Sequence, residues 1–266
     1  MLILKLGGGA QIDLQKFCED LAVLARKKKI ILVHGGNFEF DQIAEKLGHK
    51  SRHVKNVDGQ SSRYTDRKTL EILEMVYCGK INKAIVENLQ KIGVNAVGLS
   101  AMDGRIAEGV RQAKLRITEN GKQKILHGDC TGSLKKINRK LLDLLLENNF
   151  LPVLTPPAFA DDGSAINVDG DKLASLIAQE FQAEKLIFFS ETPGLLKDLK
   201  DEKSLIVKIP KNEIDNFAEF AQARMKKKIL SAKRALENSV KEIIFADGRV
   251  DQPITKALAG EGTHIW

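Results

Sequence analysis

Short apolar runs alternate with segments of helical periodicity along most of the chain. The apolar runs predict buried strands at Leu2–Leu6, Ile30–Val33, Ala96–Leu99, Leu151–Thr155, 186–189 and 242–245. Between them, hydrophobic residues recur about every 3.6 positions and predict amphipathic helices, the first of them capped by Asp13. Strands that alternate with helices indicate a mainly parallel open sheet with helices on both faces. We therefore expect an α/β fold, a three-layer αβα sandwich.

Other stretches complete this outline. A helix is expected at 41–47, a polar loop at 56–65, and a long helical pattern from Thr65 to Ile92 with a bend near Gly79. Alternating residues on either side of Asn120–Gly121 predict a hairpin with a tight turn. Further helices are predicted at 138–148, 170–181, 212–220 and 225–237. Because no linker separates the halves, we expect two lobes, 1–168 and 169–266, that share one sheet.

The composition excludes several classes of protein. Lys and Arg number 42 against 35 Asp and Glu, and the formal charge of +7 indicates either an acidic partner or, as the simpler explanation, a solvated lysine-rich surface. Aromatic residues are only 5%, which argues against a nucleic-acid partner. No apolar run is long enough for a membrane span, and no secretory signal precedes the first strand, so no membrane role is expected. Cys18, Cys78 and Cys130 are too widely spaced to suggest a disulfide framework or a zinc site, and we expect a cytoplasmic protein.

Glycines follow the first two predicted strands, at the edge where parallel sheets bind their ligands. Lys5 belongs to a strand that ends in Gly7–Gly9, and His34 is followed by Gly35–Gly36. Glycines there allow the backbone to approach an anion closely, and exposed N–H groups at helix starts bind phosphate. The order of residues fits neither the P-loop nor the dinucleotide-binding pattern. Taken alone, either glycine group favours a structural turn over a ligand site.

Polar segments of the second half fall at the same edge. Asn167–Asp171 places three polar side chains before a helix, although a cap needs only one of them. Ser190–Gly194 follows an apolar strand, as a nucleotide-facing loop does. Arg224–Lys228 opens a helix with basic residues, which the helix dipole disfavours unless an anion binds there. A solvated surface remains an equal explanation for Lys226 and Lys227.

Together these residues favour phosphoryl transfer. That reaction asks a protein mainly for positioning and for stabilisation of spreading negative charge. A lysine on each side of the transferred group can attract the two oxygens, and an aspartate between them can fix their ammonium groups. A carboxylate acceptor is ionised near neutral pH and needs no base. His34 and His127 are accordingly interpreted as ordinary polar residues.

With these residues in this order, the chain resembles the amino acid kinase family over essentially its whole length. Within the family it is similar to the acetylglutamate kinase group, and most similar to the LysZ subgroup of lysine and arginine biosynthesis. The motifs that carry the resemblance occur in the family's order: Lys5–Gly8, Val33–Gly36, Arg63–Asp66, Gly98–Ser100, Asp103–Gly104, Asn167–Asp171, Pro193–Gly194, Met225–Lys228, Asp247–Arg249 and Gly262–Thr263. The stretch Gly59–Asp66, the segment Asp129–Gly132 and the run Arg224–Lys228 favour the LysZ subgroup.

The resemblance implies an ATP-dependent transferase that phosphorylates a side-chain carboxylate to an acyl phosphate. The substrate would be 2-aminoadipate, with glutamate left open, linked through its amino group to LysW, a small acidic carrier protein. The resemblance assigns catalysis to Lys5, Lys228 and Asp171, substrate binding to Gly35, Gly36, Arg63 and Asn167, and nucleotide binding to Gly7, Gly8, Ser190, Gly194, Leu195 and Lys197. Mg²⁺ would be held through phosphates and water, so no residue is assigned as a metal ligand. The N-terminal lobe would bind the amino-acid substrate and form a homodimer through 66–92, and the C-terminal lobe would bind ATP.

Several departures keep alternatives open. Asn37 stands where acetylglutamate kinases have a third glycine, Ala101 and Asp169 replace a glycine and an asparagine, and Ala223–Arg224 replaces two glycines. An acetylglutamate kinase remains the alternative enzyme, and a non-catalytic amino-acid-binding regulator is the alternative of another class. The presence of both catalytic lysines, Lys5 and Lys228, argues against the non-catalytic regulator. The surplus of basic residues predicts a docking face that steers an acidic carrier by long-range attraction.

Overall fold

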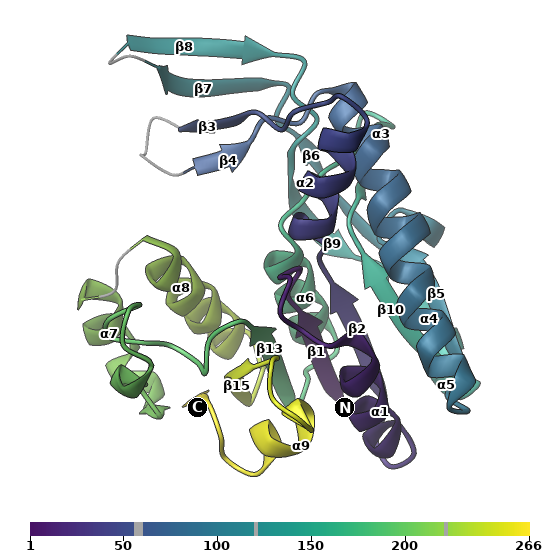
Figure 1. Ribbon diagram of the computed structural model, residues 1–266, viewed down its shortest axis with the longest axis vertical. Coiled ribbons are helices and arrows are strands. Elements are labelled where there is room, and N and C mark those ends of the chain that lie inside the picture. The colour runs from purple at the N-terminus through teal and green to yellow at the C-terminus, as the bar shows by residue number, and fades with distance from the viewer. Residues whose placement is uncertain (56–60, 120–121, 221–222) are drawn as a thin grey trace.

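The computed structural model describes residues 1–55, 61–119, 122–220 and 223–266, drawn as a ribbon in Figure 1. The turn predicted at Asn120–Gly121 and the part of the polar loop at 56–60 lie outside the described residues, as do the side chains at 224–227. None of the helices in these ranges has the length and apolar character that a membrane crossing needs.

An eight-stranded sheet runs through the whole molecule. Its strands stand in the order β14-β16-β15-β13-β1-β2-β10-β5, and every neighbouring pair is parallel except β15 with β16. Their bounds are β1 (Leu2–Leu6), β2 (Ile30–His34), β5 (Ala96–Ser100), β10 (Leu151–Thr155), β13 (Lys185–Ser190), β14 (Lys208–Ile209), β15 (Glu242–Asp247) and β16 (Thr263–Ile265). The six predicted strands are confirmed, and β14 and β16 are too short to produce a readable period.

Helices cover both faces of this sheet, which confirms the three-layer prediction (Figure 1). Leu4 and Leu6 of β1 point to one face, where they share a core with α1 (Leu14–Ala25), α4 (Asn82–Lys91) and α9 (Pro253–Leu258). Ile3 points to the other face, where it shares a core with α5 (Lys140–Glu147), α6 (Gly170–Glu180) and α8 (Ala223–Glu237). The short helix α7 (Ile214–Phe220) packs against α8.

The helices near the first glycines differ from their predicted bounds. α2 (Asn37–Lys46) begins four residues earlier than expected, directly after the glycines, so its N-terminus faces the strand edge. The long pattern after residue 65 comprises α3 (Arg67–Glu74), a π-helical segment η1 (Met75–Ile81) and α4. The expected bend near Gly79 is therefore a widened helical turn, because a π-helix absorbs the change without breaking the helix.

Small sheets form the end of the molecule above α2 (Figure 1). Two hairpins project there: β3 (His53–Lys55) with β4 (Ser61–Arg63), and β7 (Lys114–Glu119) with β8 (Lys122–His127). The second confirms the predicted hairpin, while β4 forms inside the stretch expected to be a loop. A four-stranded sheet lies between them and the main sheet, in the order β12 (Ala165–Ile166), β11 (Ala158–Ala160), β6 (Ala107–Arg111) and β9 (Gly132–Ile137). Single 3₁₀ turns are η2 (Asp103–Arg105), η3 (Glu202–Ser204) and η4 (Lys211–Glu213).

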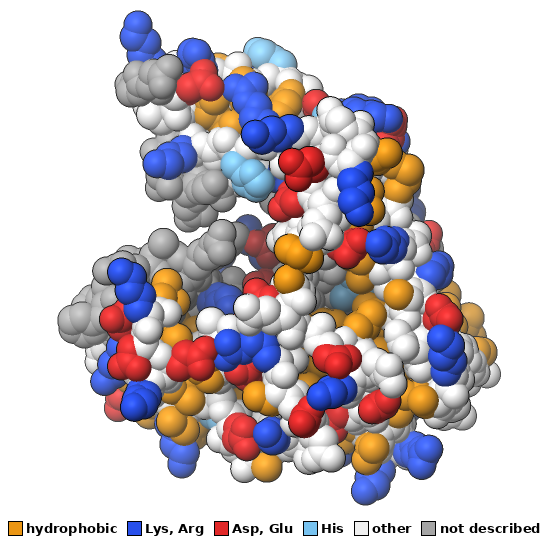
Figure 2. All heavy atoms as spheres, viewed as in Figure 1, with side chains coloured by type: hydrophobic (Ala, Val, Ile, Leu, Met, Phe, Trp, Pro, Cys, Tyr) orange, Lys and Arg blue, Asp and Glu red, His pale blue; other side chains and the backbone are white. Residues whose placement is uncertain are grey.

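A hollow separates the two ends of the molecule. Figure 2 shows it between the hairpins and the α7–α8 region, with both acidic and basic side chains visible inside. The carboxyl ends of β1, β2 and β13 lie side by side, because Leu6 of β1 stands opposite both His34 of β2 and Phe189 of β13. The segments that follow these strands are thereby brought to one edge.

Candidate active site

Two glycine loops meet at the carboxyl edge of the sheet. Gly7 donates its N–H to Phe189 at 2.9 Å, and Gly35 donates to Leu6 at 3.0 Å. Gly8 lies so close to the start of α2 that a Cβ on it would stand 2.4 Å from the Gly36 nitrogen. Only glycine fits there, and the contact places backbone N–H groups at a helix N-terminus beside the first loop. This arrangement suits an anionic ligand such as a phosphate.

Lys5 and Asp171 form an ion pair beneath these loops. The Lys5 Nζ lies 2.7 Å from Asp171 Oδ1, and the lysine side chain is only 13% exposed. Asp171 is held in the first turn of α6, whose N-cap Asp169 accepts hydrogen bonds from the backbone of Asp171 and Lys172. Two residues far apart in sequence, both predicted from their motifs, are thus brought together by β1 and α6.

Lys228 lies on α8, on the same face of the sheet as α6. Its ammonium nitrogen is 5.7 Å from the centroid of the Phe245 ring, a distance at which a cation is attracted to the ring face. The contact anchors the first described side chain of the basic run to β15. The lysine is half-buried.

Arg63 is fixed by side chains of α2. Its Nη2 donates to Asp41 at 2.9 Å and its Nη1 to Asn37 at 3.4 Å, while its guanidinium carbon stands 4.1 Å from the centroid of the Phe40 ring. Tyr77 donates its hydroxyl to the same Asn37 oxygen at 2.8 Å. The Arg63 side chain is 9% exposed, and its buried Nε has no hydrogen-bond partner among the described residues. Such a donor is suited to a carboxylate ligand.

A buried polar network holds Asn167 in place. The Asn167 side chain donates to the Thr65 hydroxyl at 3.1 Å, and the Thr65 N–H donates to Asp129 at 3.0 Å. Asp129 also accepts from the Thr131 hydroxyl. Its carboxyl group is fully buried, and this burial raises its pKa although the hydrogen bonds act in the opposite direction. The network connects the end of β4 to the segment before α6, and so places Asn167 near the base of the hairpins.

The residues predicted to bind the nucleotide surround the end of β13. Ser190 is its last residue, and its hydroxyl lies 3.1 Å from that of Thr192. Gly194 packs against Thr263, whose hydroxyl accepts the N–H of Leu195 at 2.8 Å. The Leu195 side chain belongs to the core and offers a ligand only its backbone, whereas Lys197 is exposed. Among the described residues, no group of three or more acidic, His or Cys side chains could hold a metal.

Sequence reasoning missed His34 and Asn82 as residues of this site. His34 is fully buried at the end of β2, with its Nδ1 2.9 Å from the Gly35 oxygen and its Nε2 3.2 Å from Asn82 Nδ2. Burial lowers the pKa of His34 to about 4, against the hydrogen bond to the Gly35 oxygen, which raises it, and with a smaller contribution from the nearby Lys5 charge. The available signal was a histidine that ends a wholly apolar strand, since a buried polar ring needs partners.

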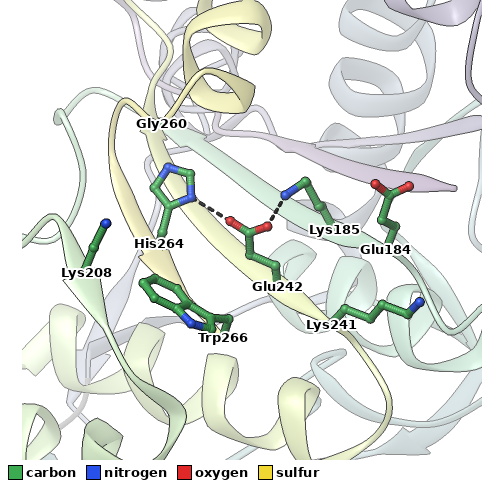
Figure 3. Close-up of a pocket in the computed structure, with 8 residues that line it drawn as sticks. All are labelled: Glu184, Lys185, Lys208, Lys241, Glu242, Gly260, His264 and Trp266. Atoms are coloured by element: carbon green, nitrogen blue, oxygen red, sulfur yellow. Dashed lines mark hydrogen bonds and ion pairs between the residues drawn. The ribbon is translucent and has the colours of Figure 1, made fainter.

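The pocket drawn in Figure 3 lies at the opposite edge of the sheet. It has a volume of about 520 Å³ and is lined by residues that begin β13 and β15, with His264 and Trp266 near the chain end. Glu242 joins Lys185 and His264 there. This pocket is separate from the glycine loops, which follow the carboxyl ends of β1 and β2.

Comparison with known proteins gives a consistent result. The chain is 52% identical to a LysW-aminoadipate kinase of Deinococcus radiodurans, over 100% of this chain and 91% of that protein. It is 48% identical to a LysW-aminoadipate kinase of Thermus thermophilus, over 100% of both chains. Among solved structures, N-acetylglutamate synthase of Neisseria gonorrhoeae with coenzyme A and N-acetyl-glutamate matches with a TM-score of 0.79 and 22% identity. The match covers 99% of this chain and 58% of the synthase, and it shows the fold alone. Residues 1–247 match the model of the amino acid kinase family, and the chain belongs to that family.

Proposed function

We propose that this protein is an ATP-dependent kinase that phosphorylates the side-chain carboxylate of 2-aminoadipate carried on LysW, giving an acyl phosphate. The observation that carries the proposal is the Lys5–Asp171 ion pair under the two glycine loops, in a chain 52% identical to a LysW-aminoadipate kinase. LysW-glutamate remains a second substrate, because one methylene in a pocket discriminates by only about 1–3 kcal/mol.

The chemistry follows from the charges at the strand edge. A carboxylate oxygen bonds to the terminal phosphorus as the bond to the leaving oxygen of ADP breaks, and no proton has to move. Lys5 and the N–H groups at the start of α2 stabilise the charge that spreads over the transferred group. Asp171 keeps the Lys5 ammonium group in position. Lys228, on the α8 side, attracts the leaving oxygen.

The amino-acid part of the substrate binds at the base of the hairpins. Arg63 pairs with its α-carboxylate, for which the buried, unpartnered Nε is available. Asn167 donates to the same part of the substrate, and Gly35 and Gly36 provide backbone donors to the reacting end. These residues belong to the lobe 1–168, which also forms a homodimer through 66–92.

The lobe 169–266 binds ATP. Ser190, Gly194, Leu195 and Lys197 hold the nucleotide after β13, and Gly7 and Gly8 receive its terminal phosphate. The close approach of Gly8 to the start of α2 fits phosphate groups, because the cradle has room for no side chain. Mg²⁺ held by phosphates and water would neutralise part of their charge. We place this activity in the cytoplasm.

The hairpins provide a docking face for the acidic carrier. The strands β3, β7 and β8 carry five Lys or Arg residues and a single acidic residue, Glu119. On β7, Lys114 and Arg116 are exposed while Leu115 and Ile117 pack inward. Arg63 ends β4 opposite His53 of β3, so a carrier bound to these strands would present its linked amino acid beside Arg63. Figure 2 shows basic side chains at this end of the molecule.

The decisive experiment traps the acyl phosphate with hydroxylamine in the presence of ATP. Four acceptors are compared: LysW-aminoadipate, LysW-glutamate, N-acetylglutamate and N-acetyl-aminoadipate. We expect turnover with the carrier-linked acceptors and little with the free ones. Preference for free N-acetylglutamate would establish the acetylglutamate kinase alternative, and absence of product from all four would favour the non-catalytic regulator.

Charge reversal tests the docking face. Lys114→Glu with Arg116→Glu should raise the KM for LysW-aminoadipate about tenfold at low salt, because electrostatic steering contributes at least that factor to association. The difference should shrink as salt increases, and the KM for ATP should not change. The matched control is Lys27→Glu with Lys29→Glu, the same charge change on exposed residues at the opposite edge of the sheet. Equal effects from both pairs would contradict a localised face.

A further inference from the structure

His34 occupies an unusual place for a polar residue. It ends the buried strand β2 directly before Gly35 and Gly36, and none of its surface is exposed. Its backbone oxygen accepts the Thr155 hydroxyl of β10 at 3.2 Å, so the residue is tied to the neighbouring strand. Both ring nitrogens also have a polar neighbour. A fully buried ring with every polar atom engaged is held in one orientation.

Asn82 determines which ring nitrogen carries the proton. The Asn82 Nδ2 donates to the Val153 oxygen at 2.9 Å, and its Oδ1 accepts the Lys83 ammonium group at 3.2 Å. These partners identify the amide nitrogen as the atom 3.2 Å from His34 Nε2. An amide nitrogen can only donate, so Nε2 accepts and the proton of the neutral ring is on Nδ1.

The Nδ1–H group therefore donates to the Gly35 oxygen at 2.9 Å. That oxygen and the Gly36 N–H belong to one peptide unit, which is planar, and this bond is trans. In a trans peptide the N–H points opposite to the C=O. A ring that holds the carbonyl toward the core thus directs the Gly36 N–H away from the core. The Gly36 nitrogen lies beside Gly8, where the two glycine loops meet, and its N–H faces the Tyr77 hydroxyl, which a ligand on this side would have to share or replace.

We propose that His34 is a positioning residue for phosphoryl transfer: its neutral Nδ1–H tautomer, selected by Asn82, aims the Gly36 N–H at the reacting group. The proposal rests on the proposed function and deepens it. Gly36 is the N-cap of α2, so its N–H also lies at the positive end of the helix dipole. A hydrogen bond to the carbonyl polarises the peptide and makes this N–H a stronger donor.

The environment keeps the ring neutral. Desolvation is the main cause that lowers the pKa of His34 to about 4; the hydrogen bond to the Gly35 oxygen acts against it, and the charge of Lys5 on β1 adds to it. From α4, Asn82 presents a neutral amide to the ring, and the Lys83 ammonium group lies behind that amide. The donor to Gly35 is consequently present unchanged across the physiological pH range.

A pair of variants separates hydrogen bonding from packing. In His34→Asn the amide nitrogen takes the place of Nδ1 and can still donate to the Gly35 oxygen, whereas in His34→Gln the amide lies farther out, near the place of Nε2. Loss of an aimed donor costs about 10²–10³ in turnover when complete, and we expect His34→Gln to lower kcat at least about tenfold. His34→Asn should retain kcat within about threefold, and the KM for ATP should change little in both.

Each variant is the control for the other, because both remove the imidazole ring. Thermal unfolding is recorded alongside to identify any loss of folded enzyme. Equal losses of kcat in folded His34→Asn and His34→Gln, or no loss in either, would overturn the proposal. The assay uses whichever of the four carboxylate acceptors the unaltered enzyme phosphorylates, so a wrong substrate assignment does not affect this comparison.

A second measurement needs no activity. In protein labelled with ¹⁵N-histidine, the signals that disappear in His34→Gln report the His34 tautomer. We expect a neutral ring with its proton on Nδ1 at every pH from about 5.5 to 8.5. A proton on Nε2, or titration near the ordinary histidine pKa, would overturn the proposal even if the enzyme proved inactive toward all four acceptors.

Discussion

Gly8 offers the most direct test of the geometry of the site. In Gly8→Ala, the new Cβ would stand 2.4 Å from the Gly36 nitrogen and 2.6 Å from the Asn37 nitrogen. Ordinary contacts are about 3.5 Å, so the two loops must separate by about 1 Å. The obstructing atoms are backbone atoms at the start of a helix and cannot rotate away. Since a misplacement of about 1 Å can cost about 10²-fold in rate, we expect kcat to fall about 100-fold.

The assay is hydroxylamine trapping under saturating ATP and acceptor, with urea unfolding measured in parallel. Crowding should also lower the free energy of unfolding by about 1–3 kcal/mol, which leaves a folded protein to assay. Gly79→Ala is the matched control, because nothing lies within 4 Å of its added Cβ. Neither glycine has a positive φ, so backbone strain does not enter. A folded Gly8→Ala variant with kcat within about threefold of Gly79→Ala would refute the reasoning.

Three further predictions concern single side chains. Lys5→Met should lower kcat about 10²–10³-fold, and Asp171→Asn should lower it about tenfold, both measured as turnover in rapid-quench experiments. Near-normal turnover of Lys5→Met would contradict the role of this lysine in the mechanism. Arg63→Lys should raise the KM of the amino-acid substrate about tenfold by steady-state kinetics, because lysine cannot form a bidentate pair, and an unchanged KM would contradict the assignment. Unfolded His34 takes up a proton near pH 6.5 and the folded residue only near pH 4. The free energy of unfolding should therefore fall by up to about 3 kcal/mol as pH drops through this window, a component that urea titrations of His34→Asn should lack.

The sequence predicted the sheet well because its strands are buried on both faces and its helices are amphipathic. A few residues are enough to recognise an apolar run such as Ile30–Val33 or a periodic segment such as Leu14–Ala25. The strands β14 and β16 could not be found this way, since two or three residues contain no period. The early start of α2 was missed because glycines, which usually end elements, here begin a helix.

For the site, the sequence indicates single residues whose own motif holds the chemistry, and it gives no signal for contacts between residues of different elements. Lys5 and Asp171 were predicted separately, and their ion pair joins residues that only the sheet brings together. The support of Arg63 by Asn37 and Tyr77 depends on the course of η1, which the sequence indicated only as a bend. Such contacts are set by tertiary packing, so no local pattern records them.

His34 illustrates why a local misfit in a sequence is informative. A leucine at that position would continue the apolar strand and pack at no polar cost, whereas a buried imidazole destabilises the fold unless each nitrogen finds a partner. Here Asn82 donates to one ring nitrogen and the Gly35 oxygen accepts from the other. The buried imidazole therefore requires a second buried polar side chain, that of Asn82. The pair also ties α4 to β10 through the Val153 oxygen. In our proposal it has a further use, because a hydrogen bond at the carbonyl of a peptide fixes the plane of that peptide, and so the direction of its N–H, without occupying the side on which the ligand binds.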